Sequence, residues 1–247
     1  MHPDWLRAEW RTPGVASLMS TRSGGGSVAP WDSMNLGVAV GDDPQQVARN
    51  RARFEQALGA APVFMKQVHG TRVLTLTYEH LALPMQEADA CITSEPGLAC
   101  TVQVADCLPV LLAAPGAVGA AHAGWRGLAG GVIDATVQRL CEAAACEPAQ
   151  LECWLGACIG PDSFEVGADV LEGFGVQPAA ADPLRFKPLP HGKWLANLPL
   201  LARDRLAALG VTRVSGGSWC TVQDRSRFFS FRRERVTGRM AASIWLC

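Results

Sequence analysis

Three residues with side chains that can bind a metal ion stand at breaks between short apolar runs. His69 lies in QVHG, Cys107 in VADCLPVLL and His122 in AAHAGWRG. Each position is the end of a predicted strand or the break between two strands. Such positions are where a rigid scaffold meets a loop, and functional residues are often found there. We therefore expect the three side chains to converge on one site.

A thiolate and two imidazoles make a zinc site of the catalytic kind. They supply three protein ligands and leave the fourth tetrahedral position open to water or substrate. Zinc would lower the pKa of a bound water to about 7 and so supply hydroxide at neutral pH. Asp106, the neighbour of Cys107, is a candidate catalytic proton carrier or a hydrogen-bond partner of the ligands.

The same atoms permit a second chemistry, in which Cys107 is a thiolate nucleophile and His122 is its base. The protein would then be a hydrolase. Both readings need the thiolate form of Cys107, and a lone His or Cys near a strand end is more often structural than functional. The spacing of these residues alone does not separate the alternatives.

The cysteine content favours free thiols. The chain has nine cysteines, an odd number, and no CxxC pair, which excludes zinc fingers and thioredoxin-type redox motifs. The charged N-terminal segment MHPDWLRAEWRTPG lacks the apolar core of a signal peptide, so we expect a cytoplasmic protein in which most cysteines are free thiols. Most thiols should be small buried groups; examples are Cys91, Cys141, Cys146 and Cys153.

The overall composition is that of a folded protein with a large core. The 247 residues include 22 Lys+Arg against 23 Asp+Glu, and 49% are hydrophobic. So apolar a chain is not globally disordered, and its near-zero net charge disfavours nucleic acid as a partner. No apolar window approaches the roughly 20 residues of a membrane span, so we expect no membrane association.

The predicted strands come in groups and do not alternate strictly with helices. Residues 62–121 form a sheet-rich region, and a helix over 44–59 has Asp42 or Asp43 as its cap. Grouped strands favour an α+β fold, a single domain over 1–247 with mixed β-sheets flanked by helices. The other predicted elements are helices over 131–145 and 198–209 and strands over 14–19, 154–158, near 213, 228–231 and 242–246.

Several long segments resemble the bacterial YfiH-type family. This laccase-like family has been described as multicopper polyphenol oxidase, as peptidoglycan editing factor and as purine nucleoside phosphorylase with adenosine deaminase activity. The resemblance follows the same order over nearly the whole chain. It rests on TRSGGGS, NLGVAVGDD, KQVHG, ADACITSEPGLACTVQVADCLPVLL, GAAHAGWRGLAGGV, LGACIGPDSFEVG and CTVQDRSRFFSFRRERVTGRMAASIWL.

The resemblance implies a zinc ion held by the histidine of VHG, the cysteine of ADC and the histidine of HAGWRG. In this chain those residues are His69, Cys107 and His122. It also implies a single α+β domain and two activities. One is phosphorolysis of adenosine, inosine, guanosine and methylthioadenosine, and the other is deamination of adenosine. The expected partners are therefore purine nucleosides and phosphate, while the oligomeric state stays open.

Phosphorolysis requires a phosphate site near the ribose. The candidates are Arg22 beside its glycine loop, Lys66, and Arg126 in GWRGLAGG at a predicted helix start. Backbone N–H groups at helix starts and guanidinium groups both favour anions. Trp125 is a candidate for stacking on a base or for core packing.

Two other functions compete with this one. The first is a cysteine-type hydrolase or amidase that acts on peptidoglycan precursors, with Cys107 as nucleophile. The second is a copper oxidoreductase acting on phenols. It is disfavoured because one His/Cys/His set does not supply the several copper centres that a laccase needs. The HxE and PCxxC signature of nucleobase deaminases is absent from the sequence, so any likeness to those enzymes is chemical only.

Overall fold

Two β-sheets packed face to face form the centre of the fold in the computed structural model, which describes residues 2–247. The four-stranded sheet has the order β1 (Val15–Met19), β13 (Met240–Leu246), β5 (Leu98–Val104), β2 (Ala61–Val63). The six-stranded sheet has the order β12 (Arg213–Gly216), β8 (Glu152–Leu155), β6 (Leu108–Ala114), β7 (Ala117–Ala123), β4 (Ala90–Thr93), β3 (Val73–Thr75). Both sheets mix parallel and antiparallel pairs.

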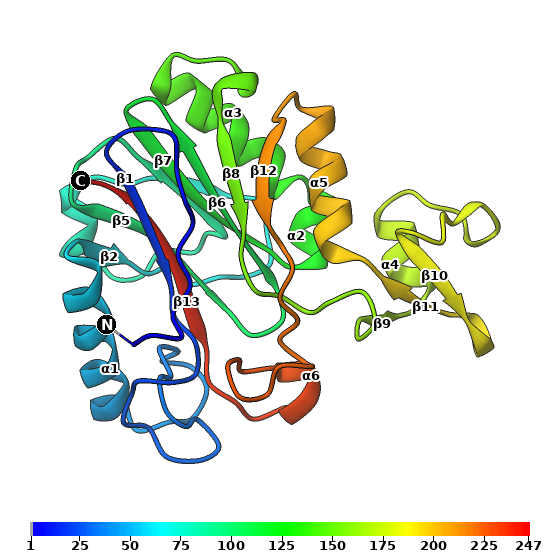
Figure 1. The fold of residues 1–247 in the computed structure, drawn as a ribbon, viewed down its shortest axis with the longest axis horizontal. Helices are drawn as coiled ribbons and strands as arrows, with labels where there is room; N and C mark the ends of the chain where they lie inside the picture. Colours follow the sequence, from blue (N-terminus) through cyan, green and yellow to red (C-terminus); the bar gives the residue numbers. More distant parts are fainter. Residues whose placement is uncertain (1) are drawn as a thin grey trace.

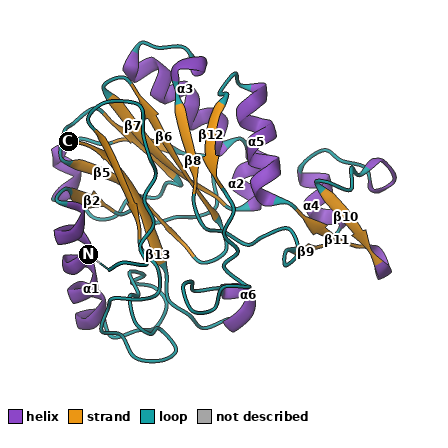
Figure 2. Cartoon of the chain, in the orientation of Figure 1, coloured by secondary structure: helices purple, strands orange, loops and turns teal. Residues whose placement is uncertain are grey.

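Helices cover the outer face of each sheet (Figures 1 and 2). Helix α1 (Pro44–Leu58) packs Phe54 and Leu58 on the four-stranded sheet. The six-stranded sheet is covered by α2 (Trp125–Gly130), α3 (Val132–Ala144) and α5 (Leu198–Ala208). The result is a helix–sheet–sheet–helix arrangement, which confirms the predicted α+β class with mixed sheets flanked by helices.

Strand β6 shows how the sequence encodes the two inner layers. Every residue of LPVLLAA is buried. Successive side chains point to opposite faces, so Val110 and Leu112 contact the helical layer while Leu111 and Ala113 contact the other sheet. Because both faces are covered, the strand is a continuous apolar run without polar alternation.

A small arm projects from one end of the molecule (Figure 1). It consists of β9 (Glu165–Val166), α4 (Ala168–Gly173), β10 (Phe186–Leu189) and β11 (Lys193–Ala196). Elsewhere, a short helix α6 (Phe231–Glu234) precedes β13. Single turns of 3₁₀ helix occur at Tyr78–Leu81, Pro148–Gln150, Pro178–Ala180 and Pro190–Gly192.

The three long helices lie where the sequence predicts them. Asp43 caps α1, because its side chain accepts a hydrogen bond from the backbone N–H of Gln45. Gly59 ends the same helix with φ of 67°, a conformation that costs glycine little. No helix within residues 2–247 is both long enough and apolar enough to cross a membrane.

Two predicted strands are wrong in position or type. The strand expected over 228–231 does not exist: Phe228 and Phe229 are both fully buried, and Ser230 caps α6 by accepting a hydrogen bond from the Arg233 backbone. The strand expected over 154–158 is β8, which ends at Leu155. Beyond it the chain leaves the sheet, and Ile159 donates to the backbone carbonyl of Asp106.

All nine cysteines are free, in agreement with the prediction that most of them are. Cys91 and Cys153 are buried, in agreement with their expected role as small apolar groups. Cys141 and Cys146, near the end of α3, are only partly buried, so the prediction of full burial is wrong for this pair.

Candidate active site

The pairing of β6 with β7 brings Cys107 and His122 together. The two strands are antiparallel, with Pro109 opposite His122 and Leu108 opposite Ala123. Cys107, directly before β6, therefore lies beside the end of β7. His69 reaches the same place from the loop between β2 and β3, and the three ligand atoms all lie within 4.8 Å of one another.

The distances suit a single metal ion. Cys107 Sγ lies 3.8 Å from His69 Nε2, and the two imidazole rings are 4.9 Å apart at an angle of 71°. Zinc–sulfur and zinc–nitrogen bonds place neighbouring donors of a tetrahedral site about 3.5 Å apart. His122 is buried, Cys107 is partly buried and His69 is exposed, so the centre is open to solvent on one side.

Asp89 organises this centre, and the sequence analysis missed it. The side chain lies directly before β4 and is fully buried. Its Oδ1 lies 2.8 Å from His122 Nδ1 and accepts a bond of 2.9 Å from the His69 N–H. Its Oδ2 accepts from the N–H groups of Val68 (3.1 Å) and Gly70 (2.7 Å). A lone carboxylate in the apolar run ADACIT was the available signal.

Two consequences follow from the contacts of Asp89. A carboxylate only accepts hydrogen bonds, so Nδ1 of His122 carries a proton, and Nε2 is the nitrogen that would bind a metal once its own proton has left. The three N–H bonds also hold the 68–70 loop, in which His69 has φ of 61°. Non-glycine residues adopt this left-handed conformation only when their surroundings impose it.

The electrostatics favour the thiolate of Cys107. Burial alone would raise the pKa of this thiol, but the charge and hydrogen bonds of His122 and His69 outweigh burial and lower it to about 6. Burial likewise opposes charging of His122, yet Cys107 and Asp89 raise its pKa to about 9. The thiolate, which is the form that binds metals or attacks an electrophile, is therefore present at neutral pH.

The carboxylate of Asp106 ties together the segments around the site. Its Oδ1 accepts from the Thr221 hydroxyl and its Oδ2 from the Arg232 backbone, each at 2.6 Å. Asp106 has φ of 96°, and these bonds hold that left-handed conformation. The bond to Arg232 also fixes the first turn of α6, which carries Phe231.

Two pockets meet at Cys107 and Phe231. The larger, of about 430 Å³, contains the three metal-binding side chains together with Lys66, Gln103 and Arg239. The smaller, of about 180 Å³, is mainly apolar and is lined by Trp125, Phe164 and Leu198. A more open groove of about 790 Å³ runs past Trp10 and Trp219 and contains none of the metal-binding residues.

The structure brings one of the three predicted phosphate-binding residues to the metal-site pocket. Lys66 lines it, with its Nζ 2.8 Å from Glu87. Arg126 is exposed and stacks over the Trp125 ring at 4.3 Å, but it does not line either pocket at the centre.

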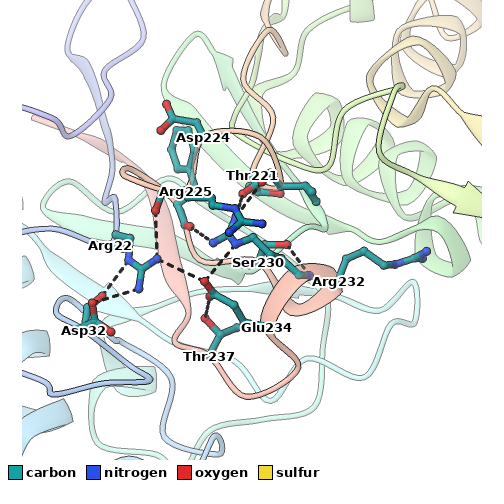
Figure 3. A network of polar contacts seen from close by, with 12 residues as sticks. Arg22, Asp32, Thr221, Asp224, Arg225, Ser230, Arg232, Glu234 and Thr237 are labelled. Carbon is teal, nitrogen blue, oxygen red and sulfur yellow. Dashed lines mark hydrogen bonds and ion pairs between the residues drawn. The ribbon is translucent and has the colours of Figure 1, made fainter.

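Arg22 lies in a network of polar contacts (Figure 3). Its guanidinium binds the carbonyl and carboxylate of Asp32 and the carbonyl of Arg225, and it lies 3.7 Å from Glu234. The arginine therefore joins the N-terminal glycine loop to the segment before α6. It does not line either pocket at the metal-binding residues.

Comparison with known proteins gives relatives along the whole chain. The family model described as multi-copper polyphenol oxidoreductase laccase matches residues 16–247. A protein of Escherichia coli named purine nucleoside phosphorylase YfiH is 46% identical over 96% of this chain and 97% of that one. A purine nucleoside phosphorylase of Pseudomonas aeruginosa is 44% identical over 98% of each chain.

Solved structures are also similar to this chain over nearly its whole length. A Neisseria meningitidis protein of the DUF152 family is 43% identical, with a TM-score of 0.89 over 98% of this chain and 99% of that one. A Bacillus licheniformis protein named YfiH is 30% identical, with a TM-score of 0.92 over 100% of this chain and 97% of that one.

Proposed function

The chain belongs to the multi-copper polyphenol oxidoreductase laccase family, in its YfiH-type branch, and from this premise we propose that it is a purine nucleoside phosphorylase. The observation that carries the proposal is the centre formed by His69, Cys107 and His122 between two pockets. The names of the full-length relatives support the same activity.

The proposed reaction exchanges one bond at the ribose for another. An oxygen of phosphate forms a bond to C1′ while the bond from C1′ to the purine nitrogen breaks. The electron pair of that bond leaves with the purine, which takes up a proton, and the products are a free purine and ribose 1-phosphate, or 5-methylthioribose 1-phosphate when the substrate is methylthioadenosine. The substrates we propose are adenosine, inosine, guanosine and methylthioadenosine, with deamination of adenosine as a second activity.

In this proposal the smaller pocket binds the purine and the larger pocket binds phosphate. Trp125, Phe164 and Phe231 surround the smaller pocket, and their rings offer flat apolar surfaces for a purine. The sugar would then lie beside Cys107, where the pockets meet. Phosphate would enter the larger pocket, which contains Lys66; phosphate binding by Arg22 and Arg126 stays a prediction from the sequence.

We propose zinc as the metal that His69, Cys107 and His122 hold. Zinc supplies Lewis acidity and acidifies water near neutral pH, which suits the deamination of adenosine. Asp89 orients His122 and the 68–70 loop toward the metal. The role of Asp106 as a proton carrier stays a prediction from the sequence. In the structure its carboxylate accepts two hydrogen bonds from other parts of the chain.

The copper in the family description agrees with the ligands of this site but not with a centre of several copper ions. Two imidazoles and a thiolate also suit copper. However, the described residues contain one group of three or more metal-binding side chains within reach of one ion. A reaction with several copper centres would need more. Metal analysis of protein purified without added metal should therefore find zinc, at about one ion per chain.

Product analysis tests the function. The metal-quantified protein is incubated with adenosine, with and without phosphate. Adenine and ribose phosphate that form only with phosphate support phosphorolysis, and inosine supports deamination. Absence of both products would overturn the proposal.

The cysteine-type hydrolase remains the second candidate because the pKa of Cys107 is lowered to about 6. As a metal ligand, Cys107 should resist iodoacetamide until a chelator removes the metal. As a nucleophile, it should be alkylated in the active enzyme, with loss of activity. Peptide mapping before and after chelation separates the two roles.

We also place the protein in the cytoplasm. All nine of its cysteines are free thiols, and thiols stay reduced in that compartment. Purine nucleosides and phosphate are both available there.

A further inference from the structure

Arg239 presents its guanidinium to the metal-site pocket. It lines the pocket together with His69, Cys107 and His122. Within residues 2–247, no carboxylate lies within ion-pair distance of Arg239, whereas Arg22 and Arg233 each have such a partner. Its Nη1 donates to the carbonyls of Thr237 and Gly238, each at 3.0 Å. Its Nε and Nη2 have no protein acceptor in the part of the chain that the structure describes.

The position of Arg239 is set by its surroundings and not by a salt bridge. The backbone N–H of Arg239 donates to Asn35 Oδ1 at 2.9 Å, and the same oxygen accepts from Gly37 at 2.9 Å. Asn35 is fully buried, so it fixes the segment before β13 against the 35–40 loop, which forms one wall of the pocket. The guanidinium also lies 5.9 Å from the centre of the Phe231 ring.

Gly37 makes room for this arginine. A Cβ atom on Gly37 would lie 2.7 Å from Cγ and 3.1 Å from Cβ of Arg239, closer than van der Waals contact allows. The glycine of NLGVAVGDD therefore lets the aliphatic part of Arg239 pack along the loop. The side chain is held in place before any ligand arrives, which reduces the entropic cost of binding.

We propose that Arg239 binds an oxyanion in this pocket and that, given the proposed phosphorylase function, the oxyanion is the phosphate co-substrate. A guanidinium with two unpaired donors can bind two oxygens of phosphate side by side. Lys66 is a weaker anchor, because its ammonium is exposed and already paired with Glu87. Arg239 thus places phosphate beside Cys107 and Phe231, where the two pockets meet.

Direct binding of inorganic phosphate to the metal-loaded protein tests the proposal. Calorimetry or ³¹P line broadening gives a dissociation constant without any need for turnover. We expect Arg239→Gln to weaken phosphate binding by at least about tenfold, the loss typical of a charge-assisted contact. Arg239→Lys, which keeps the charge but loses the planar fork, should bind phosphate with intermediate affinity.

The matched control is Arg225→Gln. Arg225 is exposed and its side chain does not line either pocket, so this variant removes the same charge and should bind phosphate as the parent does. If Arg239→Gln fails to fold, Arg239→Lys and Gly37→Ala provide the same comparison. In Gly37→Ala the charge remains while the added methyl group displaces the side chain.

The outcomes separate this inference from the proposed function. Phosphate binding that depends on Arg239, in a protein without nucleoside turnover, would keep the oxyanion site and reject the phosphorylase. In an active enzyme, the Michaelis constant for phosphate should rise in Arg239→Gln by at least as much as the dissociation constant, and more than that for the nucleoside. No phosphate binding by the parent, or equal binding by the parent and Arg239→Gln, would overturn the inference.

Discussion

Replacing Asp89 by asparagine should weaken metal binding without removing any ligand. The carboxylate serves four donors, two on each oxygen. Asparagine keeps one acceptor oxygen, and its amide group turns two of these contacts into contacts between donors. If the oxygen still faces His122 and His69, the N–H groups of Val68 and Gly70 lose their acceptor.

The size of the effect follows from those lost contacts. A hydrogen bond to a charged group contributes about 1.5–3 kcal/mol, so two of them amount to about 3–6 kcal/mol of unfolding free energy. Native proteins are stable by about 5–15 kcal/mol, so the variant remains folded unless the parent lies at the lower end of that range. Loss of a hydrogen-bond partner of metal ligands lowers metal affinity by about 10–100-fold, and we expect Asp89→Asn to fall in this range.

Chelator competition at fixed pH measures the metal affinity, and urea unfolding of the metal-free protein measures stability. Glu152→Gln is the control, because Glu152 is also buried and accepts from Arg11 N and Thr12 Oγ1, but lies away from the metal-binding residues. This control should lose stability and keep its metal affinity. An Asp89→Asn protein that is folded and binds zinc as tightly as its parent would refute the reasoning.

Three further outcomes follow from the structure. Gly124→Ala places a Cβ 2.9 Å from both Cys107 Sγ and His69 Cδ2, so it should lose metal in the same competition assay, whereas Gly130→Ala should retain it. Cys107→Ser should contain less metal than its parent by elemental analysis, because a hydroxyl is a poor substitute for a thiolate; unchanged content would favour the nucleophile. Glu152 stabilises the fold at neutral pH: burial opposes its ionisation, but hydrogen bonds from Arg11 and Thr12 outweigh burial and hold its pKa below the usual 4.5. This contribution to stability is complete above pH 4.5 and is lost as pH falls through the lowered pKa of Glu152. In urea unfolding, the stability of Glu152→Gln should therefore fall less steeply with decreasing pH than the stability of the parent. An equal fall in both proteins would contradict the assignment.

The sequence alone predicts the elements whose signals are local. Helix α1 has a capping aspartate, a proline in its first turn and a terminal glycine, and each acts within a few residues. The region 228–231 shows where such reasoning fails. Phe228 and Phe229 are adjacent and both fully buried, so this segment lacks the single buried face that the alternating pattern predicts. Long-range packing decides this segment, and no short pattern records it.

The residues of the candidate site likewise fall into those that the sequence identifies and those that only the fold brings together. His69, Cys107 and His122 can be found from residue type and from their place at strand breaks, because ligands must be particular residues. Asp89 and Arg239 act through partners that only the fold supplies. Asp89 meets His122 because β4 pairs with β7, and Arg239 faces the pocket because Asn35 and Gly37 hold it from about 200 residues away in the chain. A sequence therefore identifies the atoms that bind a metal more readily than those that orient the metal ligands and the substrate. This difference is why the predictions that bear most directly on mechanism concern these two residues.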